Sequence, residues 1–174
     1  MLEKAHVELT VTETQRAMHA HEIAQGLGVK EFDGIVTVSG DGLFHEVVNG
    51  IMSRDDHEQF FESTTLGIIP GGTANGLAKS ILAESDELYA IKEAAFLVAK
   101  GQRLSMDLTE YDGEYESSKI YSFLSLTWSI IADCDINSEA IRCCGPPRFT
   151  IWGVWRCLFR RDYFADFLYK GFKV

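Results

Sequence analysis

The stretch from residue 32 to residue 53 constrains the fold of this chain more than any other. Residues 32–38 form a near-continuous apolar run, as expected for a strand buried on both faces of a parallel sheet. A Ser-Gly-Asp-Gly turn follows at 39–42. Apolar residues then recur at the i, i+3, i+4, i+7 spacing of one helix face: Phe44, Val47, Val48 and Ile51. A strand that passes through a tight turn into a helix is the building unit of parallel α/β folds.

The turn at 39–42 also suggests chemistry. A glycine turn between a strand and a helix presents backbone N–H groups to an anion. Asp41 lies inside this turn, where a carboxylate would repel phosphate. The acid therefore indicates a base, a metal contact or a sugar contact rather than a pure phosphate site, although Asp-Gly also occurs in ordinary turns. A second glycine turn, Pro-Gly-Gly-Thr-Ala-Asn-Gly, stands at 70–76.

The chain divides into an α/β part up to residue 102 and a β-rich part from residue 103. In the first part, alternating strand and helix patterns predict a parallel sheet. The predicted strands cover 7–11, 32–38 and 65–69, the predicted helices cover 15–27, 43–53, 74–82 and 86–99, and a polar loop covers 54–64. In the second part, paired strands at 104–109 and 120–128, with a turn at 112–114, precede helices at 135–142 and 149–168.

Composition excludes several classes of protein. The net charge is −10, and the chain outside residues 139–174 carries −14, which disfavours binding to nucleic acid. The chain has no run of about 18 apolar residues, as a membrane-spanning helix needs. The first 20 residues contain no apolar signal-peptide core, and the four cysteines lack metal-ligand spacing. We therefore expect a cytosolic protein with reduced thiols.

Three blocks of this sequence resemble the diacylglycerol kinase catalytic superfamily, and in particular its sphingosine kinase branch. The block at 39–50 resembles the nucleotide-binding signature, with Ser-Gly-Asp-Gly as in that branch. The block at 70–75 resembles the second phosphate loop, and the block at 122–139 resembles one found chiefly in sphingosine kinases. The resemblance implies an α/β fold in which a parallel-sheet nucleotide-binding lobe (1–102) is followed by the start of an antiparallel β-sandwich lobe that binds lipid (103–174).

The resemblance also implies an activity, the ATP- and Mg²⁺-dependent phosphorylation of sphingosine or a related long-chain base on its primary hydroxyl, giving sphingosine 1-phosphate. Asp41 matches the family's catalytic acid, which would act as general base toward the hydroxyl. Asp135 and Ser39 match residues that bind the substrate, and Glu139 matches an acid near the metal. The remaining matches are nucleotide contacts: Thr12, Glu13, Arg16, Ser39, Gly40, Gly42, Glu46, Gly72, Thr73, Ala74, Arg142 and Arg148.

The sequence departs from the family pattern in two ways. Thr73 and Ala74 stand where sphingosine kinases usually have serine and glycine. The family's opening strand with its Asn-Pro-x-x-Gly turn, and the closing part of its second lobe, have no counterpart here, so we expect a truncated chain. Two alternatives therefore stay open. One is a ceramide or diacylglycerol kinase of the same superfamily, and the other is an inactive truncated product that acts as a binding or regulatory protein.

The segment 149–161 is basic and aromatic, and its apolar residues form one stripe at helical spacing: Ile151, Val154, Trp155 and Leu158. Helices of this kind dock at a membrane interface or into calmodulin. The alternative is that the stripe packs on the second lobe. We expect a cytoplasmic protein that associates transiently with the membrane surface, with calmodulin and a second copy of the chain as alternative partners.

Overall fold

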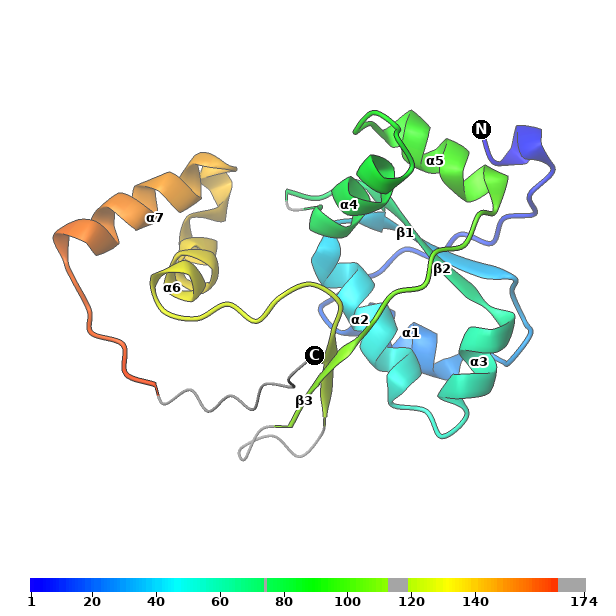
Figure 1. Ribbon diagram of the computed structural model, residues 1–174, viewed down its shortest axis with the longest axis horizontal. Helices are drawn as coiled ribbons and strands as arrows, with labels where there is room; N and C mark the ends of the chain where they lie inside the picture. The colour runs from blue at the N-terminus through cyan, green and yellow to red at the C-terminus, as the bar shows by residue number, and fades with distance from the viewer. Residues whose placement is uncertain (74, 113–118, 166–174) are drawn as a thin grey trace, which may run out of the picture. The chain divides into compact units, whose positions relative to one another are not determined.

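The computed structural model describes residues 1–73, 75–112 and 119–165, with the backbone alone at Arg142. The chain forms two compact units, Met1–Ser125 and Leu126–Val174 (Figure 1). The first unit extends past residue 102, because the hairpin that follows packs against one of its helices. The predicted boundary between the family's two lobes, at 102–103, is a different division from that of the compact units and stays a prediction.

A parallel pair of strands forms the centre of the first unit. β1 (Gly34–Ser39) pairs with β2 (Thr65–Pro70), and their last residues, Ser39 and Pro70, lie opposite each other. Each strand is followed by a helix, α2 at Asp41–Met52 and α4 at Gly76–Glu84. Because both strands run in the same direction and end at the same level, the two glycine turns leave the same edge of the sheet. The expected α/β class with a parallel sheet is confirmed.

Helices cover both faces of this sheet. On one face, α1 (His19–Gly26), α2 and α3 (His57–Ser63) pack against Ile35 and Leu66 of the strands. On the other face, α4 and α5 (Ile91–Lys100) contribute buried residues that pack around Ile69 and Val36: Leu82 and Ala94. Successive strand residues point to opposite faces, so each strand supplies both layers. The apolar stripe predicted on α2 is buried at all four positions: Phe44, Val47, Val48 and Ile51.

Two predictions for the first unit are wrong. Residues 7–11 form no strand, since no neighbouring strand pairs with them within the described residues, and Val11 is 88% exposed. The predicted loop at 54–64 contains α3 instead. Its Phe60 is only 1% exposed, and the Arg54 guanidinium stacks 4.7 Å from the centre of the Phe60 ring. The helix forms because one aromatic side chain reaches the core, a tertiary contact that the polar sequence around it conceals.

A short antiparallel hairpin completes the first unit. β3 (Thr109–Tyr111) pairs with β4 (Ile120–Ser122), so both strands are shorter than the predicted 104–109 and 120–128. Most of the turn predicted at 112–114 lies outside the described residues. Asn49 of α2 fixes the hairpin, because its Nδ2 donates to the Tyr121 carbonyl (2.8 Å) and its Oδ1 accepts from the Tyr121 N–H (2.9 Å).

Up to residue 165, where the described part of the chain ends, the second unit contains three helical segments: α6 (Ile130–Asn137), η2 (Ser138–Cys144) and α7 (Pro147–Leu158). The helix predicted at 135–142 therefore starts earlier and continues after Asn137 as a 3₁₀ segment that is kinked at Ile141. Gly145, with φ at +63°, separates η2 from α7. Pro147 begins α7, where the missing N–H of proline leaves no hydrogen bond unmade.

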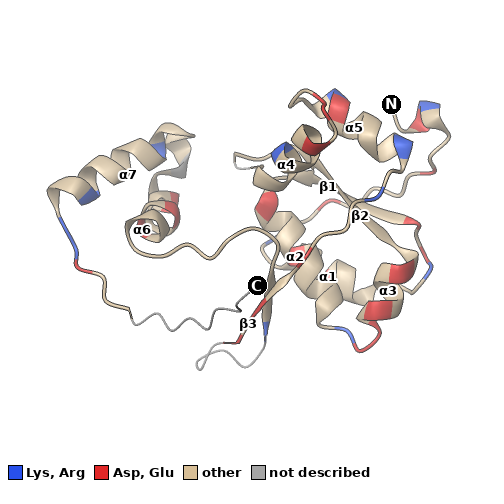
Figure 2. Cartoon of the chain, in the orientation of Figure 1, with Lys and Arg blue, Asp and Glu red and all other residues tan. Residues whose placement is uncertain are grey.

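The helix predicted at 149–168 ends at Leu158, and its last residues, 166–168, lie outside the described part of the chain. Residues 159–165 are not helical, and the Tyr163 hydroxyl donates a hydrogen bond back to Asp133 of α6. Figure 2 shows acidic residues on α6 and basic residues on α7. The predicted stripe on α7 is 50–73% exposed within the described residues: Ile151, Val154, Trp155 and Leu158. Over the same residues, no helix has the length and apolar character that crossing a membrane requires.

Candidate functional site

The two glycine turns of the first unit touch each other. A Cβ added to Gly72 would lie 2.5 Å from both the Cα and the N of Gly40. A Cβ added to Gly71 would lie 3.4 Å from the backbone N of Ser39. Such an approach of two backbones is open only to glycine at position 72. The parallel register therefore brings Gly40 and Gly72, which are 32 residues apart in the sequence, into one backbone-lined site.

Asp41 connects these turns through α4. Its Oδ2 accepts a hydrogen bond from the Gly76 N–H at 2.6 Å, and its Oδ1 accepts one from the Leu77 N–H at 3.1 Å. Both N–H groups lie in the first turn of α4, where the helix itself offers them no acceptor. The Asp41 carboxylate therefore caps α4, although Asp41 stands 35 residues before Gly76 in the sequence. The two hydrogen bonds fix the orientation of a half-buried acid beside both glycine turns. The sequence pattern indicates Asp41 as a functional residue but does not indicate this capping role.

The second turn is held by its own side chain. The Gly72 N–H donates to Asn75 Oδ1 at 3.2 Å, and Asn75 Nδ2 donates to the Gly72 carbonyl at 2.6 Å. Asn75 is 6% exposed, which protects both hydrogen bonds from water. Thr73 is exposed, and the predicted contact Ala74 lies outside the described residues. The turn is thus rigid on one side and open at Thr73.

An apolar side chain lies beside the acid. A Cβ on Gly76 would be 3.4 Å from Asp41 Oδ2 and 3.5 Å from Leu124 Cδ1. The hairpin brings Leu124 to this place, since Tyr121 is hydrogen-bonded to Asn49 on α2. Sequence analysis did not select Leu124, because its proximity to Asp41 depends on a contact across 72 residues.

The other predicted nucleotide contacts of the first unit lie around α1. Glu46 Oε2 accepts a hydrogen bond from the Ala20 N–H at 3.2 Å, at the start of α1. Arg16 donates two hydrogen bonds to Glu22, at 2.7 and 2.6 Å, and these lower the pKa of the Glu22 carboxyl. Thr12 and Glu13 are exposed. Within the described residues, no hydrogen bond or ion pair joins these side chains to the glycine turns, so their role as nucleotide contacts stays a prediction.

In the second unit, Arg148 stands at the second position of α7 and is 6% exposed. Its Nη1 lies 2.5 Å from Glu139 Oε1, and its guanidinium carbon lies 4.6 Å from the centre of the Phe149 ring. Its Nε is buried and has no hydrogen-bond partner among the described residues. A buried guanidinium with an unused donor at a helix start suits an anion. The structure thus brings the predicted contacts Glu139 and Arg148 together, while the side chain of Arg142 is outside its description.

Asp135 lines a cavity of about 420 Å³ in the second unit. Its walls come from α6, α7 and the segment before α6, and they are mainly apolar: Thr127, Ile130, Ile131, Cys134, Phe149, Gly153 and Cys157. Asp135 is the single charged residue among those that line it. One carboxylate at an apolar cavity is the arrangement that a long-chain amine would need, because it offers a partner for the ammonium group and a surface for the chain.

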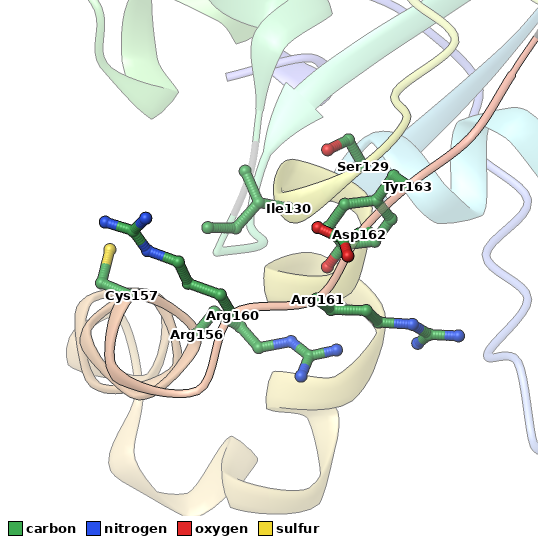
Figure 3. Close-up of a pocket in the computed structure, with 8 residues that line it drawn as sticks. All are labelled: Ser129, Ile130, Arg156, Cys157, Arg160, Arg161, Asp162 and Tyr163. Carbon is green, nitrogen blue, oxygen red and sulfur yellow. The ribbon is translucent and has the colours of Figure 1, made fainter.

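Asp133 is a polar centre that sequence analysis did not select. Its Oδ2 accepts hydrogen bonds from Arg156 Nε at 2.9 Å, from Arg156 Nη2 and from the Tyr163 hydroxyl, and Arg161 Nη1 lies 3.8 Å away. The hydrogen bonds from Tyr163 and Arg156 lower the pKa of this carboxyl. A second cavity of about 330 Å³ lies beside Arg156, Arg161 and Tyr163 (Figure 3). The partners are 23 and 30 residues away in sequence, so no local pattern could reveal them.

Comparison with known proteins identifies the family. Residues 1–111 match the diacylglycerol kinase catalytic domain. The chain belongs to this kinase family. It is 35% identical to sphingosine kinase 1 of Arabidopsis thaliana over 169 residues, which cover 97% of this chain and 34% of that protein. It is 37% identical to human sphingosine kinase 2 over 156 residues (87% and 24%), and 40% identical to sphingoid long chain base kinase 4 of Schizosaccharomyces pombe over 144 residues (83% and 30%).

The chain therefore spans about a third or less of the length of these relatives. Membership of the kinase family implies the use of ATP, with Mg²⁺ as its usual partner. The first turn of α2, whose N–H groups have no side-chain cap among the described residues, lies beside the contact of Gly40 with Gly72 and fits a phosphate group. The unused donor of Arg148 fits an anion as well. Mg²⁺ generally takes one or two carboxylates together with phosphate oxygens and water, so a single acid such as Glu139 suffices on the protein side.

Proposed function

We propose that this chain carries the ATP site and catalytic acid of a lipid kinase that phosphorylates the primary hydroxyl of sphingosine or a related long-chain base. The observation that carries the proposal is the meeting of the two glycine turns beside Asp41. Gly40 and Gly72 are so close that a Cβ on Gly72 would lie 2.5 Å from Gly40, and Asp41 is oriented by the start of α4. Kinase family membership and sphingosine kinase relatives support the same reading.

In this proposal the chain's own groups position the phosphates and neutralise their charge, as phosphoryl transfer requires. Backbone N–H groups at the start of α2, directly after the first glycine turn, bind phosphate oxygens. Arg142 and Arg148 offer guanidinium donors, and Glu139 contributes a carboxylate to Mg²⁺. When bound, ATP and Mg²⁺ supply the phosphoryl group and a counter-charge. The remaining proposed nucleotide contacts are Thr12, Glu13, Arg16, Ser39, Gly42, Glu46, Thr73 and Ala74.

Asp41 is the proposed general base. Each carboxylate oxygen accepts one backbone N–H, and each keeps a further lone pair for a substrate hydroxyl. The hydroxyl proton would pass to one of these oxygens as the hydroxyl oxygen bonds to the γ-phosphorus of ATP and the bond to the ADP oxygen breaks, with ADP as the leaving group. Ser39, which ends β1 in the same turn, is a proposed contact for the substrate. The backbone hydrogen bonds hold the acid still, so it needs no reorganisation as the proton arrives.

Asp135 is the proposed partner of the lipid head group. An ammonium group needs an anion, whereas neutral diacylglycerol does not. The apolar walls of the cavity that Asp135 lines suit a hydrocarbon chain. A protonated long-chain base is therefore favoured over the alternatives, a ceramide or diacylglycerol. We also propose a cytoplasmic location with transient membrane association through the basic and aromatic α7, for which calmodulin is an alternative partner over 149–161.

Asp41→Asn tests the catalytic role in the whole protein. Loss of a positioned general base slows phosphate transfer from ATP to sphingosine by about 10²- to 10⁴-fold. Asp107→Asn is the matched control, since Asp107 is exposed and lies outside the site. Undiminished transfer by Asp41→Asn would remove Asp41 from the mechanism. Failure of the wild-type protein to bind ATP would instead favour the alternative of a binding or regulatory protein.

Asp135→Ala tests the substrate assignment. The wild-type protein is expected to prefer sphingosine over diacylglycerol, and Asp135→Ala to lose that preference while its KM for ATP stays unchanged. The readout is kcat/KM for each lipid in the same mixed micelles, with Asp107→Ala as control. A wild-type preference for diacylglycerol would reject the long-chain base as the substrate.

A further inference from the structure

The apolar cavity of the second unit has walls on two helices. α6 contributes Cys134 and Asp135, and α7 contributes Gly153 and Cys157. The helices come close at Gly153, where an added Cβ would lie 3.9 Å from Cys134 Sγ. A change in the distance between α6 and α7 therefore changes the width of the cavity.

Apolar burial does not set that distance. Among the described side chains from residue 126 to 165, Ser138 and Arg148 alone are buried, and α6 has no buried residue. Large apolar side chains of both helices are exposed, including Ile131 at 64% and Leu158 at 73%. The packing of α6 on α7 must therefore depend largely on polar contacts.

Asp133 provides the central polar contact between the two helices. Its Oδ2 receives Nε and Nη2 of Arg156 from α7 and the hydroxyl of Tyr163 from the segment after α7. The Asp133 and Arg156 side chains are 15% and 17% exposed, so solvent screens them less than an ordinary surface ion pair. Two residues along a helix amount to about 200° of rotation, so Asp133 can bind α7 while Asp135 lines the cavity.

We propose that Asp133 is a positioning residue for the lipid substrate. Through Arg156 and Tyr163 it holds α6 at a fixed distance from α7, and this sets the cavity width at which Asp135 and the apolar walls contact a long-chain base together. Asp133 itself does not contact the substrate. The inference rests on the proposed function, because it concerns the same substrate and the same cavity.

Asp133→Asn is the main test, since it keeps the shape of the side chain and removes its charge. The expected result is a KM for sphingosine that is about ten- to a hundredfold higher, while kcat and the KM for ATP stay within about twofold. Arg156→Met should raise the KM for sphingosine to a similar extent, and Arg156→Lys should raise it less. Arg103→Met is the control. It also removes a positive charge, and Arg103 is exposed, lies outside the proposed sites and has no ion pair among the described residues.

A second readout does not depend on turnover. Cys134 and Cys157 line the cavity, whereas Cys143 and Cys144 belong to η2 and do not. Sphingosine should slow maleimide labelling of Cys134 and Cys157 in the wild-type protein and lose this protective effect in Asp133→Asn. Labelling of Cys143 and Cys144 should be equal in both and serves as the internal reference. Tyr163→Phe, which keeps the ion pair with Arg156, carries the test if Asp133→Asn reduces the helix content.

The outcomes separate this inference from the proposed function. If wild-type protein neither phosphorylates sphingosine nor is protected by it, the proposed function is wrong and the inference falls with it. If wild-type protein acts on sphingosine while Asp133→Asn keeps the same KM and the same protection, the inference alone is wrong. An equal rise in the KM for ATP would show a general structural role and would also contradict it.

Discussion

The two compact units of this chain are stabilised in different ways. The first unit has three clusters of buried apolar side chains around its sheet, and one of them joins α2 to α4. In the second unit, the described side chains leave an apolar cavity open, and α6 is joined to α7 through Asp133 and Arg156. Burial thus fixes the backbone of the proposed nucleotide site, whereas a few charges determine the shape of the proposed lipid site. A phosphate site needs exact backbone placement, while a lipid cavity needs an open apolar surface.

Among the substitutions considered, Phe60→Ala should lower the stability of the first unit the most. Phe60 is 1% exposed, and removing a buried aromatic side chain costs about 3–5 kcal/mol. Urea unfolding followed by far-ultraviolet circular dichroism measures the loss. All three tryptophans of the chain, Trp128, Trp152 and Trp155, belong to the second unit, so their fluorescence reports that unit separately.

We expect the tryptophan transition to stay in place when Phe60 is replaced. Leu88→Ala, at a side chain that is 78% exposed, is the control and should change stability by less than about 0.5 kcal/mol. An equal shift of both transitions would show that the two units unfold as one cooperative block, which would contradict the comparison.

Gly50→Ala tests how closely α1 packs on α2. An added Cβ would lie 2.4 Å from the backbone oxygen of His21, so the helices must move apart, at a cost of about 1–3 kcal/mol. The higher helix propensity of alanine offsets at most about 1 kcal/mol of this. Gly26→Ala is the matched control, since a Cβ there meets nothing within 4 Å. A stabilised Gly50→Ala variant, measured by urea unfolding, would show that the contact is not tight.

Acid should weaken the second unit through Asp133. The hydrogen bonds from Tyr163 and Arg156 lower the pKa of this carboxyl in the folded state. Ionised Asp133 therefore makes its full contribution to the stability of the second unit above the ordinary aspartate pKa of about 4. That contribution is lost as the pH falls through the lowered pKa of the folded state. Trp128 lies 5.9 Å from the Tyr163 ring, so tryptophan fluorescence can follow the change. Asp133→Asn should remove this acid transition, and its persistence would assign it to other groups.

The smallest expected effect is a pH dependence of the first unit near neutrality. Burial lowers the pKa of His45, while the charge of Glu46 opposes that shift. Neutral His45 makes its full contribution to the stability of the fold above the usual histidine pKa of about 6.5. Below that pH the contribution declines, because the unfolded chain binds a proton at His45 more readily than the folded chain does. Thermal unfolding between pH 5 and 8 measures the slope, and His45→Gln should flatten it. An unchanged slope would place the titrating group elsewhere.

The local sequence pattern predicts the structure best where tertiary packing agrees with it. The β1–turn–α2 unit followed from an apolar run, a glycine turn and a stripe at helical spacing, and the buried face of α2 matches that stripe. It failed where a distant contact decides the structure. α3 forms because Phe60 reaches the core, and residues 7–11 lack a strand partner within the described residues. The Asp133 contacts could not be predicted either, because they join residues that are far apart in sequence.

The central claim is that the contact of Gly40 with Gly72 positions the start of α2 as a phosphate site beside Asp41. Calorimetry of ATP binding to the wild-type protein, Gly72→Ala and Asp41→Asn tests it most directly, with Gly26→Ala as a control for the added methyl group. We predict that the wild-type protein, Asp41→Asn and Gly26→Ala bind ATP alike, and that Gly72→Ala binds at least about tenfold more weakly because the turns are forced apart. Equal binding by Gly72→Ala, or no binding by the wild-type protein, would contradict the claim.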